Sequence, residues 1–119
     1  MNPSDDEPAR PITPATFHIL LTLADEGAAH GYHVKRVVEE RTGGAVLLGA
    51  GTLYAGLQRM TKDGLIAETD APADDLDVEP GSRWRFYAIT PLGRDVLRGE
   101  VARMEADLAA ARAVVHRPA

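Results

Sequence analysis

The sequence predicts a mostly α-helical fold with a small β-hairpin and a long helix at the C-terminus. Three observations predict it: two Thr-Pro pairs, apolar residues that recur at helical spacing, and an aromatic, β-branched stretch at 83–90. With 119 residues, 45% of them hydrophobic, the chain is long enough for one domain. We expect a flexible N-terminal arm at 1–12, a folded domain at 13–90 and a C-terminal helix at 91–119.

The first Thr-Pro pair predicts where helix one begins. The Thr13 hydroxyl can cap the free N–H groups of the first turn, and Pro14 suits the first helical position. Gly27 is expected to end this helix. The residues that we expect to be buried share one face of it: Phe17, Leu20, Leu21 and Ala24. Helix one is therefore expected to be scaffold.

A second helix is expected from Gly31 to Thr42, followed by a minimal strand at Ala45–Leu48. Its inner side carries Val34, Val37, Val38 and Arg41. Its outer side carries Tyr32, Lys35, Arg36 and Glu39. Two interpretations of Tyr32 stay open: a solvated side chain, or a hydroxyl that contacts a phosphate with help from the helix N-terminus.

A third helix is expected over residues 52–63, after a bend at Gly49 and Gly51 and with Thr52 as its cap. Leu53, Leu57 and Met60 fall on one stripe of this helix. The opposite face carries two cations, an amide and a hydroxyl but no carboxylate: Thr52, Ala55, Gln58, Arg59 and Lys62. These are the groups that address phosphates and base edges in a major groove. Gly56 is expected to pack closely against helix one or helix two, and the alternative is a helix that becomes fully ordered only on DNA.

Residues 65–69 and 83–90 are expected to pair as a hairpin, because the second stretch is rich in aromatic and β-branched residues. The connection at 70–82 is long and acidic, and we expect DNA to repel its tip. Arg83 and Arg85 alternate onto one side of the second strand, where they can reach a minor groove or the DNA backbone. Three helices followed by a hairpin are the order of a winged helix-turn-helix domain.

The second Thr-Pro pair, at Thr90 and Pro91, predicts a final helix that runs to Val115. Its apolar residues are spaced alternately by four and three positions, as in a coiled-coil seam: Leu97, Val101, Met104, Leu108, Ala111 and Val115. We expect this seam to pack against a second copy of the chain, with folding back onto its own domain as the alternative.

Composition and charge exclude several classes of function. There is no cysteine for a disulfide or a Cys-based zinc site, and no nucleophile is paired with a base, so an enzyme is not expected. No apolar run is long enough to span a bilayer, which favours a cytoplasmic protein. His30 and His33 have no evident third ligand, so neither a metal nor another cofactor is expected.

The net charge of −5 is unevenly distributed along the chain. Residues 28–64 carry five cations and three anions, whereas residues 65–82 carry six anions and no cation. The predicted contact helix therefore lies in a locally basic segment of an acidic protein, which is compatible with a nucleic-acid partner.

Four short motifs resemble the PadR family of transcriptional regulators: HGY at 30–32, GTLY at 51–54, DGLI at 63–66 and YAITPLG at 87–93. The resemblance extends over 12–115. It implies a homodimeric winged-helix repressor in which Thr52 and Tyr54 lie at the DNA surface and the start of helix two approaches phosphates. Some family members respond to small phenolic or drug-like ligands. The terminal helix here has no aromatic residue, which argues against a flat-ligand site at the dimer interface.

We therefore expect a homodimeric, sequence-specific DNA-binding repressor of nearby genes that reads a pseudo-palindromic operator. A small-molecule effector that releases it is an open possibility. The alternatives are a winged-helix protein-interaction module and a ligand sensor with little direct DNA binding. The predicted contacts to double-stranded DNA are Tyr32, Lys35, Gly51, Thr52, Tyr54, Ala55, Gln58, Arg59, Lys62, Arg83 and Arg85.

Overall fold

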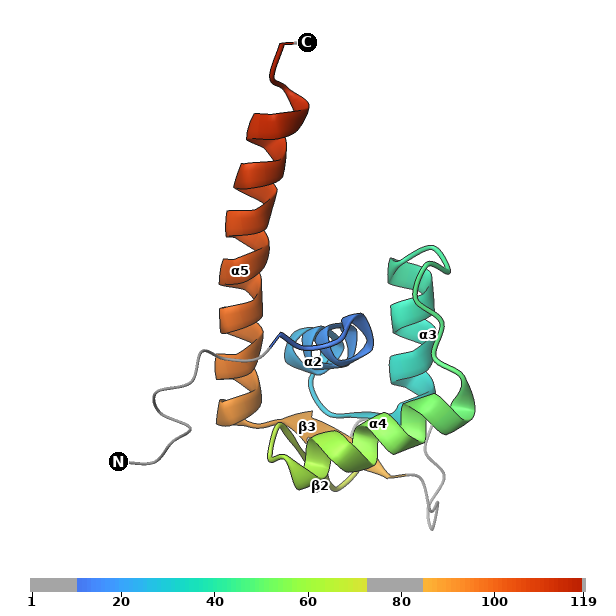
Figure 1. The fold of residues 1–119 in the computed structure, drawn as a ribbon. Helices are drawn as coiled ribbons and strands as arrows, with labels where there is room; N and C mark the ends of the chain where they lie inside the picture. The colour runs from blue at the N-terminus through green and yellow to red at the C-terminus, as the bar shows by residue number, and fades with distance from the viewer. Residues whose placement is uncertain (1–10, 73–84, 119) are drawn as a thin grey trace, which may run out of the picture.

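The computed structural model describes residues 11–72 and 85–118, and these form helices and a small sheet. The elements in chain order are α2 (Pro14–Glu26), β1 (Ala29–His30), α3 (Gly31–Arg41), α4 (Ala50–Lys62), β2 (Ile66–Thr69), β3 (Phe86–Ile89) and α5 (Pro91–Val115). In Figure 1, α2, α3, α4 and the sheet make up a body from which α5 rises as a rod. This architecture confirms the predicted fold class, a mostly helical winged helix-turn-helix arrangement followed by a long C-terminal helix.

The helix starts predicted at the two Thr-Pro pairs are confirmed. The Thr13 hydroxyl accepts a hydrogen bond from the Thr16 N–H at 3.1 Å, and the Thr90 hydroxyl accepts one from the Gly93 N–H at 3.0 Å. Gly27 ends α2 with a φ of 84°, a backbone conformation that glycine adopts without strain. The side-chain caps therefore satisfy N–H groups that the helix itself leaves without partners.

The sheet has three antiparallel strands in the order β1-β3-β2, one more than the expected hairpin. Strand β1 is only two residues long and pairs Ala29 with Tyr87. The strand predicted at Ala45–Leu48 is wrong, because these residues form a bend and an irregular stretch. Leu48 is nevertheless 1% exposed, so its apolar side chain fills the core without joining a sheet.

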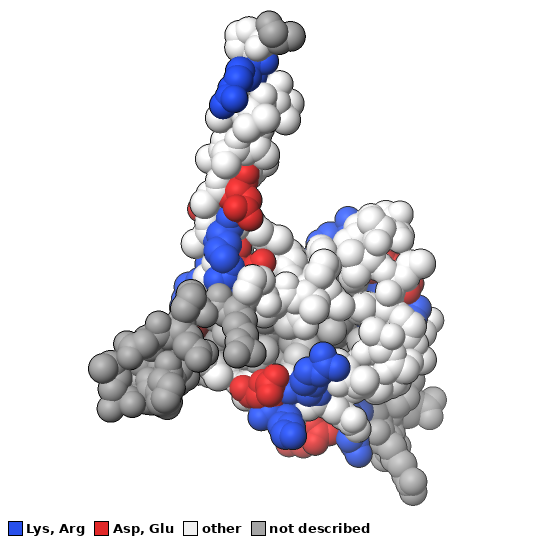
Figure 2. Space-filling model, in the orientation of Figure 1, with Lys and Arg blue, Asp and Glu red and all other residues white. Residues whose placement is uncertain are grey.

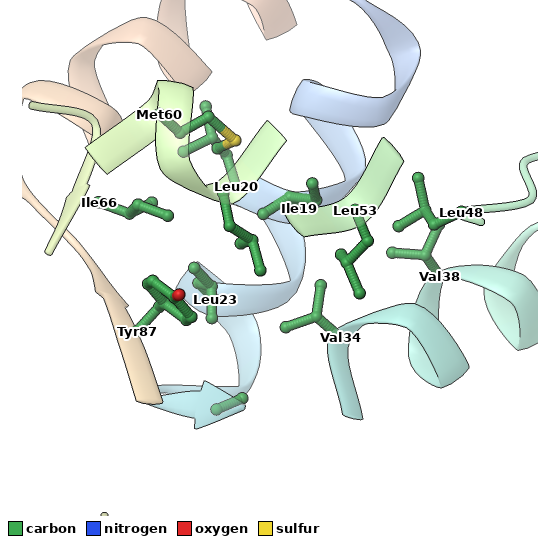
Figure 3. Packing of buried hydrophobic residues seen from close by; sticks show 12 residues of the cluster. Ile19, Leu20, Leu23, Val34, Val38, Leu48, Leu53, Met60, Ile66 and Tyr87 are labelled. Carbon is green, nitrogen blue, oxygen red and sulfur yellow. The ribbon is translucent and has the colours of Figure 1, made fainter. Parts of the chain in front are cut away.

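One apolar core joins α2, α3, α4 and the sheet (Figure 3). Leu57 of α4 and Val34 of α3 are fully buried in it. The prediction of which α2 residues are buried is partly wrong, because Phe17, Leu21 and Ala24 are only half-buried. The α2 residues that do fill the core are Ile19, Leu20 and Leu23, together with the Thr22 side chain.

The start of α5 is fixed tightly to the body. A Cβ atom added to Gly93 would lie 2.1 Å from the Leu65 carbonyl oxygen, so only glycine allows this approach. The Thr90 hydroxyl also donates a hydrogen bond to the Gly64 carbonyl at 2.6 Å. Leu97 packs against the core one turn further on. The first two turns of α5 therefore belong to the body.

The distal half of α5 extends away from the body in Figure 1. The radius of gyration, 16.8 Å, exceeds the value of about 13 Å that a compact chain of this size would have.

No helix within residues 11–72 and 85–118 is long and apolar enough to cross a membrane.

Candidate nucleic-acid interface

Helix α4 begins two residues earlier than predicted, and its cap is Gly49. Gly49 is extended, with φ −62° and ψ 153°, and its carbonyl accepts the first helical hydrogen bond from the Leu53 N–H at 2.8 Å. The predicted cap at Thr52 is therefore wrong, since Thr52 already lies inside the helix and is exposed. Its hydroxyl is on the outward face instead of being used at the helix end.

The two faces of α4 divide as the sequence predicts. Leu53, Leu57 and Met60 are between 0% and 3% exposed, which holds the helix against the core. Figure 2 shows Lys and Arg side chains together with some acidic ones over the lower end of the body, where α4 and β2 lie. Apart from Ala50 at the helix start and Tyr54, the α4 residues that face solvent are polar, basic or small: Gly51, Thr52, Ala55, Gln58, Arg59 and Lys62.

Two tyrosines flank this outward face. Tyr54 of α4 is 52% exposed and Tyr32 of α3 is 60% exposed. Gly31, which precedes Tyr32, lies close to α4: a Cβ added there would lie 3.2 Å from the Leu57 side chain and 3.6 Å from the Tyr54 ring. The absence of a side chain at Gly31 thus lets the start of α3 approach α4 closely.

Gly56 does not have the packing role that was predicted for it. A Cβ added at Gly56 would meet no described atom within 4 Å, so the expected close approach to an earlier helix is wrong. The glycine that α3 and α4 need at their contact is Gly31, from the HGY motif.

The first turn of α3 is organised by histidines. The Nδ1 atom of His30 accepts a hydrogen bond from the His33 N–H at 3.2 Å, so His30 caps the helix. The His33 ring in turn pairs with Glu26 at the end of α2. Within the residues that the structure describes, no three potential ligands are placed to hold a metal ion. A capping role for His30 was not anticipated, because histidine is not among the common capping residues.

Lys35 is directed along its own helix. Its Nζ atom lies 2.7 Å from Glu39 Oε1, and both side chains are about 30% exposed. A phosphate would have to compete with this partner for the ammonium group. Lys35 is therefore a weaker candidate for DNA contact than Arg59 or Lys62, for which the described residues show no ion pair.

The base of the wing places Arg85 beside β2 and β3. Its Nε atom lies 3.4 Å from Glu68 Oε1, and both side chains are exposed. Burial, with help from the negative charge of Glu68, raises the pKa of the Tyr87 hydroxyl, while Arg85 opposes this rise by its charge and a hydrogen bond. Arg83 and most of the acidic connection lie outside the described residues.

A hollow of about 490 Å³ opens where the start of α3, the outer edge of α4 and β3 meet. Four of its lining residues were predicted to contact DNA, although nothing in the sequence indicated that they surround one cavity. The predicted members are Tyr32, Tyr54, Gln58 and Arg85, and the others are His30, Gly31 and Tyr87.

The predicted dimerisation residues differ in burial along α5. Leu97 packs against the core of its own chain. By contrast, Val101, Met104 and Leu108 are 39%, 44% and 49% exposed, and Ala111 and Val115 are also exposed. The seam is thus one apolar line of which only the first residue is covered.

Comparison with known proteins places the chain in a family. A model of the transcriptional regulator PadR-like family matches residues 19–99. The chain belongs to this family. The match confirms the resemblance predicted from the HGY, GTLY, DGLI and YAITPLG motifs. It also confirms that the chain is not an enzyme, because the family is one of transcriptional regulators.

A relative and several solved structures are similar to this PadR-like chain. It is 33% identical over 79 residues to an uncharacterized protein of Lysinibacillus sphaericus, covering 66% of this chain and 68% of the relative. The transcriptional regulator Cth-833 of Clostridium thermocellum superposes with a TM-score of 0.64 at 22% identity, over 83% of this chain and 89% of that one. Bacillus subtilis PadR in complex with operator DNA gives a TM-score of 0.56 at 21% identity, over 70% and 44% of the two chains. The structural likenesses show a shared fold.

Proposed function

We propose that this PadR-like regulator binds double-stranded DNA with α4 in a major groove. The observation that carries the proposal is the outward face of α4, where Gln58, Arg59 and Lys62 are exposed and no residue of the helix is acidic. The fold shared with B. subtilis PadR, whose structure contains operator DNA, supports it. A helix of this kind presents both base-reading and phosphate-binding groups to the groove.

The exposed side chains divide into two roles in this proposal. Gln58 and Arg59 suit base edges, since an amide pairs with adenine and a guanidinium with guanine. Lys62 and Thr52 suit phosphates. Tyr32, Tyr54 and Arg85 lie at the edges of the α4 face, where the DNA backbone would pass. Arg83 is proposed as a further backbone or minor-groove contact on the basis of its place in the sequence.

The chain is proposed to act as a homodimer through the seam on α5. Val101, Met104 and Leu108 offer an exposed apolar line along α5. Charged and uncharged surface alternate along this rod in Figure 2. Packing against a second copy would remove these side chains from water. Two α4 helices would then enter successive major grooves, with half-sites about 34 Å apart on a pseudo-palindrome.

The proposed regulatory role follows from DNA binding by α4 and dimerisation through α5. A dimer seated on a promoter would repress nearby genes in the cytoplasm by excluding other proteins from the same DNA. Release by a small-molecule effector would require a ligand that favours the unbound dimer.

DNA binding is tested by fluorescence anisotropy with DNA from a genomic fragment selection. Arg59→Ala should weaken binding by about 1–3 kcal/mol and flatten the preference at one base pair, if Arg59 reads a base. Arg98→Ala, which changes an exposed arginine of α5, is the matched control and should leave affinity unchanged. Failure to find any salt-sensitive DNA binding would contradict the proposal and favour a protein-interaction module.

Dimerisation is tested by sedimentation. Leu108→Asp places a charge in the middle of the seam and should give monomers, because an unpaired buried carboxylate is strongly disfavoured. Ala106→Asp, on the opposite face of α5, is the control and should remain dimeric. If Leu108→Asp leaves the dimer intact, the interface lies elsewhere.

A further inference from the structure

His30 is one of two buried polar side chains among the described residues, the other being Thr22. Its backbone ends β1, and its ring caps α3. Tyr32 follows two residues later and is 60% exposed. We propose that His30 is a positioning residue for DNA binding, because it fixes Tyr32 where the Tyr32 hydroxyl contacts a phosphate. This inference rests on the proposed function.

The hydrogen bond that His30 makes spans Tyr32. The Nδ1 atom of His30 accepts from the His33 N–H at 3.2 Å, so these two residues are joined across Gly31 and Tyr32. The His33 N–H is among the groups that the first turn of a helix leaves without an intrahelical partner. Without an acceptor there the first turn frays more easily, and a side chain that it carries loses its fixed direction.

The ring of His30 is itself held by the strand β3. It packs edge-on against Phe86, with the ring centroids 5.4 Å apart and the ring planes at 86°. The backbone of His30 also pairs with Phe86 in the sheet. Aromatic rings favour this edge-to-face packing, which limits rotation of the His30 ring and keeps its Nδ1 atom directed at α3. Common capping residues such as serine have no ring for this second contact, which gives a reason for histidine at this position.

Two further contacts hold the start of α3, but neither replaces the cap. Gly31 lies against α4, where an added Cβ would be 3.2 Å from the Leu57 side chain, and this contact fixes only the backbone before Tyr32. His33 pairs with Glu26, but their side chains are 31% and 36% exposed, so salt weakens that pair. The hydrogen bond from a backbone N–H to the buried ring of His30 is not screened in this way.

The placement of Tyr32 matters because a hydrogen bond to a phosphate tolerates little displacement. The two oxygen atoms of such a bond lie about 2.5–3.0 Å apart, and binding groups have to be held within about 0.5 Å of the productive geometry. Tyr32 lines the same hollow as Tyr54 and Gln58 of α4, so it lies beside the face that is proposed to enter the groove. On a frayed first turn Tyr32 would lose its phosphate contact even while α4 kept its own contacts.

A double-mutant cycle between His30 and Tyr32 tests the inference, with the affinity of the full-length chain for a selected genomic fragment measured by fluorescence anisotropy. Tyr32→Phe removes the hydroxyl and should weaken binding by about tenfold, since the acceptor is charged. His30→Phe keeps a ring beside Phe86 and removes the acceptor of the cap. In the His30→Phe background, Tyr32→Phe should have almost no further effect, because the hydroxyl has already lost its position.

A rescue variant and a control separate positioning from general stability. His30→Asn restores a preferred capping residue, so in that background Tyr32→Phe should again weaken binding by about tenfold. Thr13→Val is the control, since Thr13 caps α2 through the Thr16 N–H at 3.1 Å and no described residue of α2 lines the hollow. It also removes a helix cap, yet it should leave the effect of Tyr32→Phe unchanged. His30→Ala takes the place of His30→Phe if that variant does not fold.

Hydrogen exchange at the His33 amide gives a second readout that needs no DNA. Exchange should become faster in His30→Phe and stay slow in His30→Asn. An unchanged His33 amide in His30→Phe, or a full effect of Tyr32→Phe in that background, would overturn the inference. If Tyr32→Phe has no effect in the natural chain while Arg59→Ala weakens binding, the inference is wrong and the proposed function stands. If the protein binds no DNA at all, both are wrong.

Discussion

Helices α4 and α5 carry the same kind of apolar stripe, but within one copy of the chain only the stripe of α4 is fully covered. Leu53, Leu57 and Met60 of α4 are at most 3% exposed, while Met104 and Leu108 of α5 are 44% and 49% exposed. A periodic apolar pattern thus predicts that a surface will be covered without saying by what. In α4 the cover is the chain itself, and in α5 we propose a second copy.

The largest expected effect comes from shortening a side chain in the covered stripe. Leu57→Ala should lower the free energy of unfolding by about 2–5 kcal/mol, because it leaves a cavity in a fully buried region. Urea denaturation at low protein concentration measures this change. Leu108→Ala is the matched substitution in α5, and under conditions that keep the chain monomeric it should change stability by less than about 0.5 kcal/mol. Equal losses would show that α5 is covered within one copy.

A second effect is expected where the two regions join. Gly93→Ala should destabilise the chain by about 1–3 kcal/mol, because the new Cβ would lie 2.1 Å from the Leu65 carbonyl oxygen and the first turn of α5 would have to shift. Gly99→Ala is the control, since a Cβ added there meets no described atom within 4 Å. Thermal unfolding of the two variants measures the difference. An unchanged stability in Gly93→Ala would mean that the start of α5 can shift away from Leu65 at little cost.

A smaller effect of opposite sign is expected in α4 itself. Gly56→Ala should raise the free energy of unfolding by up to about 1 kcal/mol, because alanine favours a helix and the added methyl meets no described atom within 4 Å. Gly31→Ala should instead be destabilising or neutral, as its Cβ would lie 3.2 Å from the Leu57 side chain. A loss of stability in Gly56→Ala would contradict the open surroundings of that residue.

The smallest expected effect is on the pH dependence of stability. It comes from His18 of α2, the helix that contacts α5 within one chain. Burial, and then the positive charge of Arg41, hold the pKa of His18 below its usual value of 6.5. Between this lowered pKa and 6.5 the unfolded chain binds more protons, so stability should rise slightly with pH in that interval. His18→Gln should remove this contribution, which urea denaturation from about pH 5 to about pH 8 would detect as a flatter profile. An unchanged slope in the variant would place its origin in another group.

The elements with local signals were predictable. Thr13 with Pro14 and Thr90 with Pro91 mark helix starts by residue chemistry that acts within one turn, and the alternation of faces in α4 follows from helical geometry alone. The division into covered Leu57 and exposed Arg59 therefore came from spacing. Which face of a helix is buried can therefore be predicted from the spacing of its own residues, without knowing which distant residues cover it.

What sequence reasoning missed depends on distant partners. Strand β1 is two residues long, and it is a strand only because Ala29 meets Tyr87 from the far end of the domain. The predicted strand at Ala45–Leu48 had apolar residues but no neighbour to pair with. The error at Thr52 arose because Gly49 provides a helix start through its backbone alone, with no side-chain signal. The hollow needs residues from three elements, so no single stretch could indicate it.

The contact at Gly93 sets the direction in which α5 leaves the body. Helix α5 has 25 residues and is therefore about 37 Å long, so a turn of about 10° at its first residues would move its far end by roughly 6 Å. In a dimer held together at the far ends, the same turn would change the separation of the two α4 helices by a comparable amount. The close approach of Gly93 to the Leu65 carbonyl would therefore help to determine the distance between the two half-sites that such a dimer binds.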